Sequence, residues 1–128
     1  MEFAWELRLQ PRTPRELREL LIVRLAQAFG SEYELVHHSS MALAAGVSAD
    51  KLEALAGWRR SELFTGAERA ALAYAEGVLD GDVGDREADE LRRWFEPAEI
   101  VELAVTAGFY AMVPRVLDAL RVPLEGDA

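Results

Sequence analysis

Signals for the start of a helix recur along this chain, and they constrain its fold more than any other feature. Three segments place a threonine or serine three residues before a glutamate, which is the spacing of a capping box: residues 13–16, 31–34 and 65–68. Pro14 and Pro97 each suit the first turn of a helix, and Ser48 offers a further N-cap. We therefore expect a chain built almost wholly of helices.

The apolar spacing after each signal gives the expected extents. Helices are predicted at about 14–29, 32–46, 49–55, 66–80, 86–95 and 97–120. Residues 57–64 read as a connection anchored by Trp58 and Phe64. Alternation typical of a strand occurs only in the first ten residues, where a short extended arm is predicted. The prediction is one all-α domain spanning residues 1–128, a bundle of about six helices.

Composition narrows the classes of function. The 128 residues suit one domain, and none is cysteine, which excludes disulfides, thiolate metal sites and cysteine redox chemistry. The net charge of −9 opposes binding to nucleic acid. No uninterrupted apolar run approaches the roughly 20 residues of a membrane span, and the N-terminus lacks a signal peptide. We expect a cytoplasmic protein without a nucleic-acid or membrane partner.

The second predicted helix contains both histidines of the chain, His37 and His38. Glu34 lies four residues before His38 and Ser31 seven before it, so all three share one helical face. A carboxylate beside an imidazole orients the ring and stabilises its protonated form. Histidine is also the side chain most often used in general acid–base catalysis, so His38 is a candidate catalytic residue.

A purely structural interpretation of these residues stands beside the catalytic one. Ser31 and Glu34 are already explained as the two ends of a capping box, and Glu19 could form a surface ion pair with Arg15. His37 and His38 point about 100° apart on a helix, so we do not expect both to face one site. No zinc-binding pattern is present, so neither a metal nor a cofactor is predicted.

Three segments together are similar to one known superfamily. They are residues 18–26 (RELLIVRLA), 30–38 (GSEYELVHH) and 41–48 (MALAAGVS), and the helix from Glu99 through Tyr110 and Arg115 adds to the likeness. The chain resembles the carboxymuconolactone decarboxylase / alkylhydroperoxidase-D (AhpD-like) superfamily over about residues 15–122. The resemblance implies an all-helical fold that assembles into homo-oligomers (dimers, trimers or hexamers), with sites near subunit interfaces.

The resemblance also implies where a site would lie. Alkylhydroperoxidase-D proteins use a Cys-x-x-Cys-x-x-x-His motif with an upstream glutamate, and these positions fall here on Ser31, Glu34, His38 and Glu19. A serine and a glutamate cannot form a disulfide, so thiol peroxidase activity is not supported. The cysteine-free pattern is closer to the decarboxylase side of the superfamily, which uses no cofactor.

Two functions from different classes follow. The favoured one is a decarboxylase-like lyase acting on a small organic acid, with His38 as general acid/base, Glu19 as its orienting partner and Glu34 as a second carboxylate lining the site. An anionic substrate would suit the acidic chain only if Arg24, Arg59 or Arg115 turned into the pocket. The alternative is a catalytically silent oligomeric domain that binds a small molecule or a partner protein. The chain starts late compared with many relatives, so we expect one pocket wall to be either missing or supplied by a neighbouring subunit.

Overall fold

The described part of the chain, residues 11–122, is all helical. The computed structural model contains six α-helices and one short 3-10 helix there, and no strand within those residues. In chain order they are α2 (Arg15–Phe29), α3 (Glu32–Ala45), α4 (Ala49–Ala54), η1 (Leu55–Arg60), α5 (Gly66–Asp80), α6 (Asp85–Trp94) and α7 (Pro97–Ala119). The all-α prediction is confirmed, whereas the predicted N-terminal arm lies outside the described residues.

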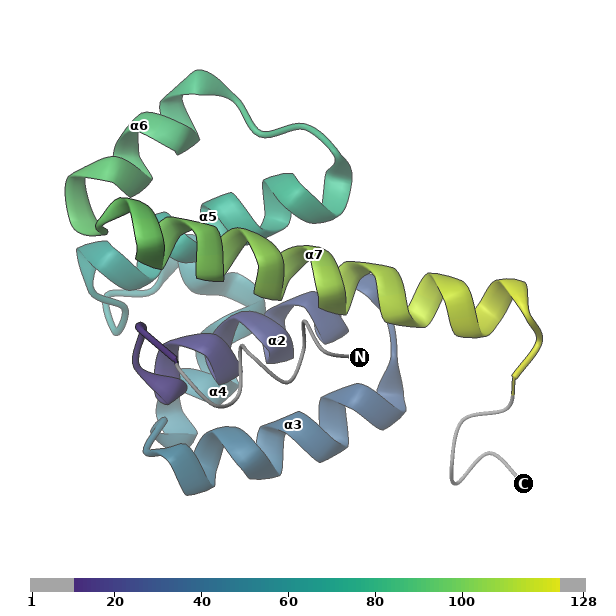
Figure 1. The fold of residues 1–128 in the computed structure, drawn as a ribbon. Helices are drawn as coiled ribbons and strands as arrows, with labels where there is room; N and C mark the ends of the chain where they lie inside the picture. Colours follow the sequence, from purple (N-terminus) through teal and green to yellow (C-terminus); the bar gives the residue numbers. More distant parts are fainter. Residues whose placement is uncertain (1–10, 123–128) are drawn as a thin grey trace.

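Helix α2 is the central element of the bundle. It packs against α3, α5 and α7, and Figure 1 shows it between α3 and α7. Eight of its residues are buried, as expected for a helix with apolar side chains on several faces: Leu17, Glu19, Leu20, Leu21, Ile22, Val23, Leu25 and Ala26. The burial of one glutamate among them is unusual, since an unpaired carboxylate in a core is costly.

The three predicted capping boxes have different outcomes. Thr65 forms a complete box with Glu68, because each side chain bonds the backbone N–H of the other residue. Ser31 caps α3 by accepting a hydrogen bond from the backbone N–H of Glu34 at 3.4 Å, but the Glu34 carboxylate turns elsewhere. The prediction for Thr13 is wrong, because Pro14 is the N-cap of α2 and no side chain caps it.

The connection between α4 and α5 is anchored as predicted. Trp58 and Phe64 are 4% and 6% exposed, so both belong to the core. Part of this connection is helical, because residues Leu55–Arg60 form η1, with Gly57 as its one non-helical residue. Burial of two large aromatic side chains fixes a segment that has little regular hydrogen bonding of its own.

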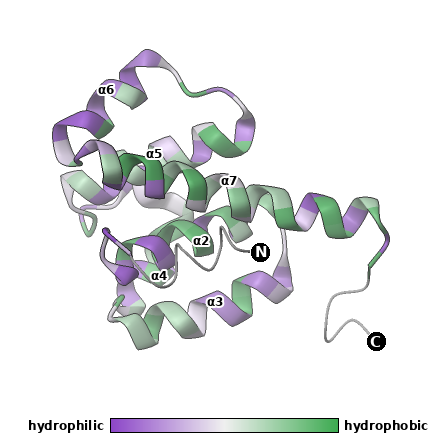
Figure 2. Ribbon diagram, in the orientation of Figure 1, coloured by the Kyte–Doolittle hydropathy of each residue, from purple (hydrophilic) through white to green (hydrophobic). Residues whose placement is uncertain are grey.

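Helix α7 is partly buried and partly uncovered. Its buried residues face α2 and α5, while its C-terminal part extends beyond the other helices, with apolar residues along it (Figure 2). Val101, Met112, Val116 and Leu120 are between 43% and 68% exposed. Among the described residues, α7 alone is long and apolar enough to cross a membrane, by length and composition only, with 28% of that stretch buried. The expectation concerned an uninterrupted apolar run, and Glu102 and Arg115 interrupt this stretch. The core helix of a soluble protein passes the same test.

Candidate functional site

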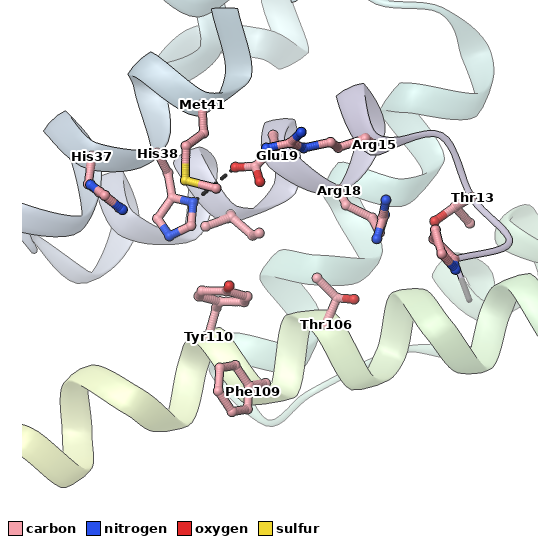
Figure 3. Close-up of a pocket in the computed structure, with 12 residues that line it drawn as sticks. Thr13, Arg15, Arg18, Glu19, His37, His38, Met41, Thr106, Phe109 and Tyr110 are labelled. Atoms are coloured by element: carbon pink, nitrogen blue, oxygen red, sulfur yellow. Dashed lines mark hydrogen bonds and ion pairs between the residues drawn. The ribbon is translucent and has the colours of Figure 1, made fainter. Parts of the chain in front are cut away.

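The predicted residues Glu19, Glu34 and His38 meet between α2 and α3. His38 is 6% exposed, and its Nδ1 lies 2.9 Å from Oε2 of Glu19, across the helix pair (Figure 3). Its Nε2 lies 3.2 Å from Oε2 of Glu34, one turn earlier on α3. One imidazole is therefore held at both nitrogens by carboxylates. This explains why Glu34 does not complete the capping box with Ser31.

The alternative ion pair between Glu19 and Arg15 is not formed. Oε2 of Glu19 faces His38, and no ion pair involves Arg15 among residues 11–122. The sequence spacing allowed both partners for Glu19, and burial decides between them. Glu19 is 5% exposed, and the nearby imidazole offers a hydrogen bond inside the core, whereas the Arg15 side chain is exposed.

A pocket of about 690 Å³ opens beside this cluster. Its size falls within the range of small-molecule sites, roughly 300–1,000 Å³. It is lined by residues of the segment before α2 and of helices α2, α3 and α7: Pro11, Thr13, Arg15, Arg18, Glu19, Ile22, His37, His38, Met41, Thr106, Phe109 and Tyr110. Glu19 and His38 border the pocket, whereas Glu34 is not among its lining residues. The prediction that Glu34 lines the site is therefore wrong in one respect: Glu34 contacts the imidazole of His38 but does not line the pocket.

The two histidines share the pocket, contrary to the expectation from their helical angle. His38 is buried, while His37 is exposed and stacks on Tyr33 with ring centroids 5.9 Å apart. The rings of His37 and His38 meet edge to face at 5.5 Å, and both border the pocket. A pocket of this width reaches around the helix, so a difference of 100° does not exclude either ring.

Tyr110 of α7 is a site residue that the sequence did not single out. Its ring contacts His38 edge to face, with centroids 5.2 Å apart, and Phe109 packs on it in turn. The imidazole is thus fixed by two carboxylates and one aromatic ring. Tyr110 stands 72 residues after His38, so no local spacing signal could have connected them.

One wall of the pocket is tied down by Glu102, a residue of α7 that is 5% exposed. Its carboxylate accepts hydrogen bonds from the backbone N–H of Arg12 at 2.6 Å and of Thr13 at 3.0 Å, and from the Thr13 hydroxyl. Arg18 adds an ion pair at 3.7 Å. Thr13 fails to cap α2 because its hydroxyl is used here. Glu102 thereby holds the pocket-lining Thr13 and Arg18 in place.

The same contacts set the charge of Glu102. Burial raises the pKa of this carboxyl, but the hydrogen bonds from Thr13 and Arg12 and the charge of Arg18 outweigh burial and leave the pKa below its ordinary value. Glu102 is therefore ionised at neutral pH, and its bonds to the pocket wall are charge-assisted.

Two arginines line the pocket, and neither was predicted to do so. Arg15 and Arg18 border it, whereas Arg24, Arg59 and Arg115 do not. Arg24 and Arg59 pair with Glu76 at 2.8 and 2.6 Å. The Arg115 guanidinium donates to the backbone oxygens of Ala111 and Leu79. All three candidate arginines make contacts away from the pocket, so none of them is placed to bind an anion there.

The arrangement suits proton transfer more than metal binding. Both imidazole nitrogens face carboxylates, and no group of three or more His, Cys, Asp or Glu side chains within residues 11–122 is arranged to hold a metal ion. An imidazole with carboxylates at both edges can take a proton at one nitrogen and release one at the other. The fold and this cluster define the class: an all-α helical bundle with a buried histidine that is paired with two carboxylates beside a pocket.

The comparisons with known proteins agree with that class. The model of the Carboxymuconolactone decarboxylase family matches residues 1–77. An uncharacterized protein of Escherichia coli K12, YnjA, is 35% identical over 113 residues, covering 86% of this chain and 62% of that protein. The chain belongs to the Carboxymuconolactone decarboxylase family. It spans less than two thirds of the length of this relative.

Solved structures show the same fold. ATU0492 of Agrobacterium tumefaciens, described as a putative antioxidant defence protein AhpD, superposes with a TM-score of 0.84 at 23% identity, covering 98% of this chain and 88% of that one. The debrominase Bmp8 in its apo form gives a TM-score of 0.74 at 26% identity, covering 90% and 63% of the two chains. A cysteine-to-alanine variant of Bmp8 in complex with 2,3,4-tribromopyrrole gives 0.78 at 24% identity, covering 98% and 67%.

Proposed function

We propose that this protein is a cofactor-independent acid–base enzyme of lyase type, acting on a small organic molecule that enters the pocket beside His38. The observation that carries the proposal is the placement of one buried imidazole between Glu19 at 2.9 Å and Glu34 at 3.2 Å, with its ring at the pocket wall. A geometry that serves only to cap α3 would not require Glu19, which comes from another helix.

The three residues have different parts in the proposed chemistry. His38 is the acid and base, because it borders the pocket and can exchange a proton. Glu19 fixes the ring orientation and stabilises the imidazolium through Nδ1, as a carboxylate does behind a catalytic histidine. Glu34 lies outside the pocket lining and contacts Nε2, so it supplies or removes the proton behind the ring.

A decarboxylation would use this set as follows. The bond between the ligand carbon and its carboxylate breaks, CO₂ leaves, and the electron pair stays on carbon, delocalised onto a neighbouring carbonyl. The Nδ1 proton of the His38 imidazolium, which is shared with Glu19 at the pocket wall, is then delivered to that carbon. Glu34 and solvent return a proton to the ring, so the protein ends in the state in which it began. Proton abstraction beside a carbonyl needs the same groups in the reverse direction.

The rival function is a silent domain that binds a small molecule without converting it. The pocket would serve that role equally well, and Bmp8 shows that a protein of this fold can hold a halogenated pyrrole. The difference lies in His38: a binding domain tolerates its loss if the fold survives, whereas the enzyme does not.

The test is a screen of lactones and keto acids against the wild-type protein, His38→Ala and Glu19→Gln. The proposal expects His38→Ala to lower turnover about 10²–10⁴-fold, the usual contribution of a general acid/base. Glu76→Gln is the matched control for Glu19→Gln, because Glu76 is also a partly buried, ion-paired carboxylate but does not line the pocket. Turnover that is unchanged in both His38→Ala and Glu19→Gln would rule out the assignment.

We also propose that the protein works as a homo-oligomer. The apolar side chains of Val101, Met112, Val116 and Leu120 are exposed on one long helix, and contiguous exposed apolar surface marks interfaces. Sedimentation velocity of the wild type against Val116→Glu tests this: a smaller species in the variant is expected. A monomeric wild-type protein would contradict the proposal.

A further inference from the structure

The end of the pocket formed by the first turn of α2 differs in charge from the rest of the protein. The chain has a net charge of −9, yet two of the charged residues lining the pocket, Arg15 and Arg18, are cationic. Among the lining residues that the structure describes, Glu19 is the one carboxylate, and it is engaged with His38. Two neighbouring arginines in an otherwise acidic protein attract anions to their end of the pocket.

The two arginines are not equivalent. Arg18 is 14% exposed at its side chain and is paired with Glu102 at 3.7 Å, so its guanidinium is fixed against the wall. Arg15 is exposed, and within residues 11–122 no hydrogen bond or ion pair holds its side chain. Its natural helical partner, Glu19, is directed to His38. Of the two, Arg15 can pair with an incoming anion without first giving up an ion pair to a described residue.

The spacing between Arg15 and the proton-transfer group is set by α2. Arg15 lies four residues before Glu19, hence about 6 Å along the helix axis. Figure 3 shows Arg15 and Glu19 on the same helix, with His38 beside the glutamate. Apolar side chains of Ile22 and Met41 also line the pocket. A ligand that reaches both points has an apolar body a few bonds long between its anionic group and its reacting carbon.

From this geometry we propose that Arg15 is the specificity-determining residue of the pocket: it pairs with a carboxylate of the ligand, at about one helical turn from the reacting carbon, while Arg18 is held back by Glu102 as a fixed background charge. This rests on the proposed function of the same site and adds to it the residue that selects the ligand. The anchored carboxylate is distinct from a group that would leave in the reaction, because a guanidinium pair stabilises the carboxylate as an anion.

The experiment uses benzoate and its neutral isostere benzamide as probes, with affinity measured by isothermal titration calorimetry on the full chain. Arg15→Gln is expected to weaken benzoate binding about tenfold, the scale of one charge-assisted contact. Arg59→Gln is the matched control, because it removes the same charge from an exposed arginine that does not line the pocket, and it should change the affinity less than twofold. Benzamide should bind more weakly and show no dependence on Arg15.

Three results overturn the proposal: equal losses in Arg15→Gln and Arg59→Gln, benzamide binding as tightly as benzoate, or no benzoate binding to the wild type at millimolar concentration. Thermal melts of both variants confirm that each is folded, which is expected because both side chains are exposed. His38→Ala separates this proposal from the enzymatic one. If His38→Ala keeps Arg15-dependent benzoate binding and the wild-type protein turns over no substrate in the screen, the anion subsite is supported and the lyase proposal fails. If turnover is found but does not depend on Arg15, the reverse holds.

Discussion

Two polar clusters of this protein are opposites in charge. At His38, one base lies between two carboxylates, Glu19 and Glu34. At Glu76, on α5, one carboxylate lies between two guanidinium groups and an indole: Arg24 at 2.8 Å, Arg59 at 2.6 Å and Trp58 Nε1 at 3.0 Å. The first cluster joins α2 and α3, which are adjacent in the chain, whereas the second joins α2, η1 and α5. The central side chain of each cluster is sheltered, although Arg59 of the second is 59% exposed.

The difference lies in what each cluster does with a proton. Burial raises the pKa of Glu76, but the hydrogen bonds from Trp58, Arg24 and Arg59 and the charge of Arg59 outweigh it, so the pKa is below its ordinary value. All its partners are donors, so the cluster has one ionisation state near neutral pH and only holds the fold together. In the His38 cluster two carboxylates face one imidazole, one more than a single ion pair requires. A ring proton can therefore be bonded to Glu19 through Nδ1 or to Glu34 through Nε2. Two carboxylates around an imidazole beside a pocket suit proton transfer, whereas a carboxylate whose partners are all donors suits a structural role.

The largest expected effect is on turnover at the first cluster. His38→Ala should abolish nearly all activity, about 10²–10⁴-fold, while the free energy of unfolding changes by only about 1–3 kcal/mol. The measurement is initial rate at saturating substrate together with chemical denaturation. A variant that loses stability but keeps its turnover would make the two clusters alike.

Glu76→Ala should give the reverse pattern. It leaves Arg24 and the buried Trp58 N–H without their acceptor, and it should lower the free energy of unfolding by about 2–4 kcal/mol. Urea denaturation followed by tryptophan fluorescence measures this. Since Glu76 does not line the pocket, affinity for benzoate in the remaining folded protein should stay within about twofold.

The response to acid should separate the clusters further. Glu76 and Glu102 have pKa values lower in the folded protein than the ordinary value of 4.5. Each therefore stabilises the fold above that value, and this contribution is lost as the pH falls from about 4.5 through the folded pKa. Wild-type stability should fall steeply in that range, and Glu76→Gln and Glu102→Gln should each flatten the fall. Melting curves at pH 3–7 test this, and an unchanged slope in both variants would contradict the assignment.

An exposed ion pair should show the smallest effect. Arg92 and Asp89 on α6 are paired at 2.8 Å, but their side chains are 66% and 74% exposed. Arg92→Gln should change the free energy of unfolding by at most about 0.5 kcal/mol, because solvent screens such pairs. A loss as large as that of Glu76→Ala would show that burial is not what distinguishes these contacts.

Local signals in the sequence predicted local structure well. The extents of α2 and α5, the complete capping box at Thr65 and the glycine that ends α3 all depend on residues a few positions apart. Within the site, the i,i+4 spacing predicted that Glu34 and His38 meet. Glu19 was predicted as a site residue from the family resemblance, because its spacing alone favoured an ion pair with Arg15.

Contacts between distant residues explain what the sequence did not reveal. The Thr13 hydroxyl prefers a buried carboxylate 89 residues later over capping its own helix. The pocket arginines were misassigned because Arg24 and Arg59 are taken by Glu76, which lies 52 and 17 residues after them. In each case the side chain binds a residue distant in sequence instead of the partner or pocket that local spacing favoured. Only the packing of α2, α5 and α7 reveals that distant partner.

The bond between the segment before α2 and Glu102 has a consequence for the order in which this protein is made. Thr13 leaves the ribosome long before Glu102, and closing a contact across about 90 residues is entropically costly. Helices α2 and α3 can pair early, since they are adjacent in the chain, and can bring His38 to Glu19. The wall of the pocket must wait for α7. The His38–Glu19 pair can thus form early during synthesis, whereas the pocket wall beside it is completed last.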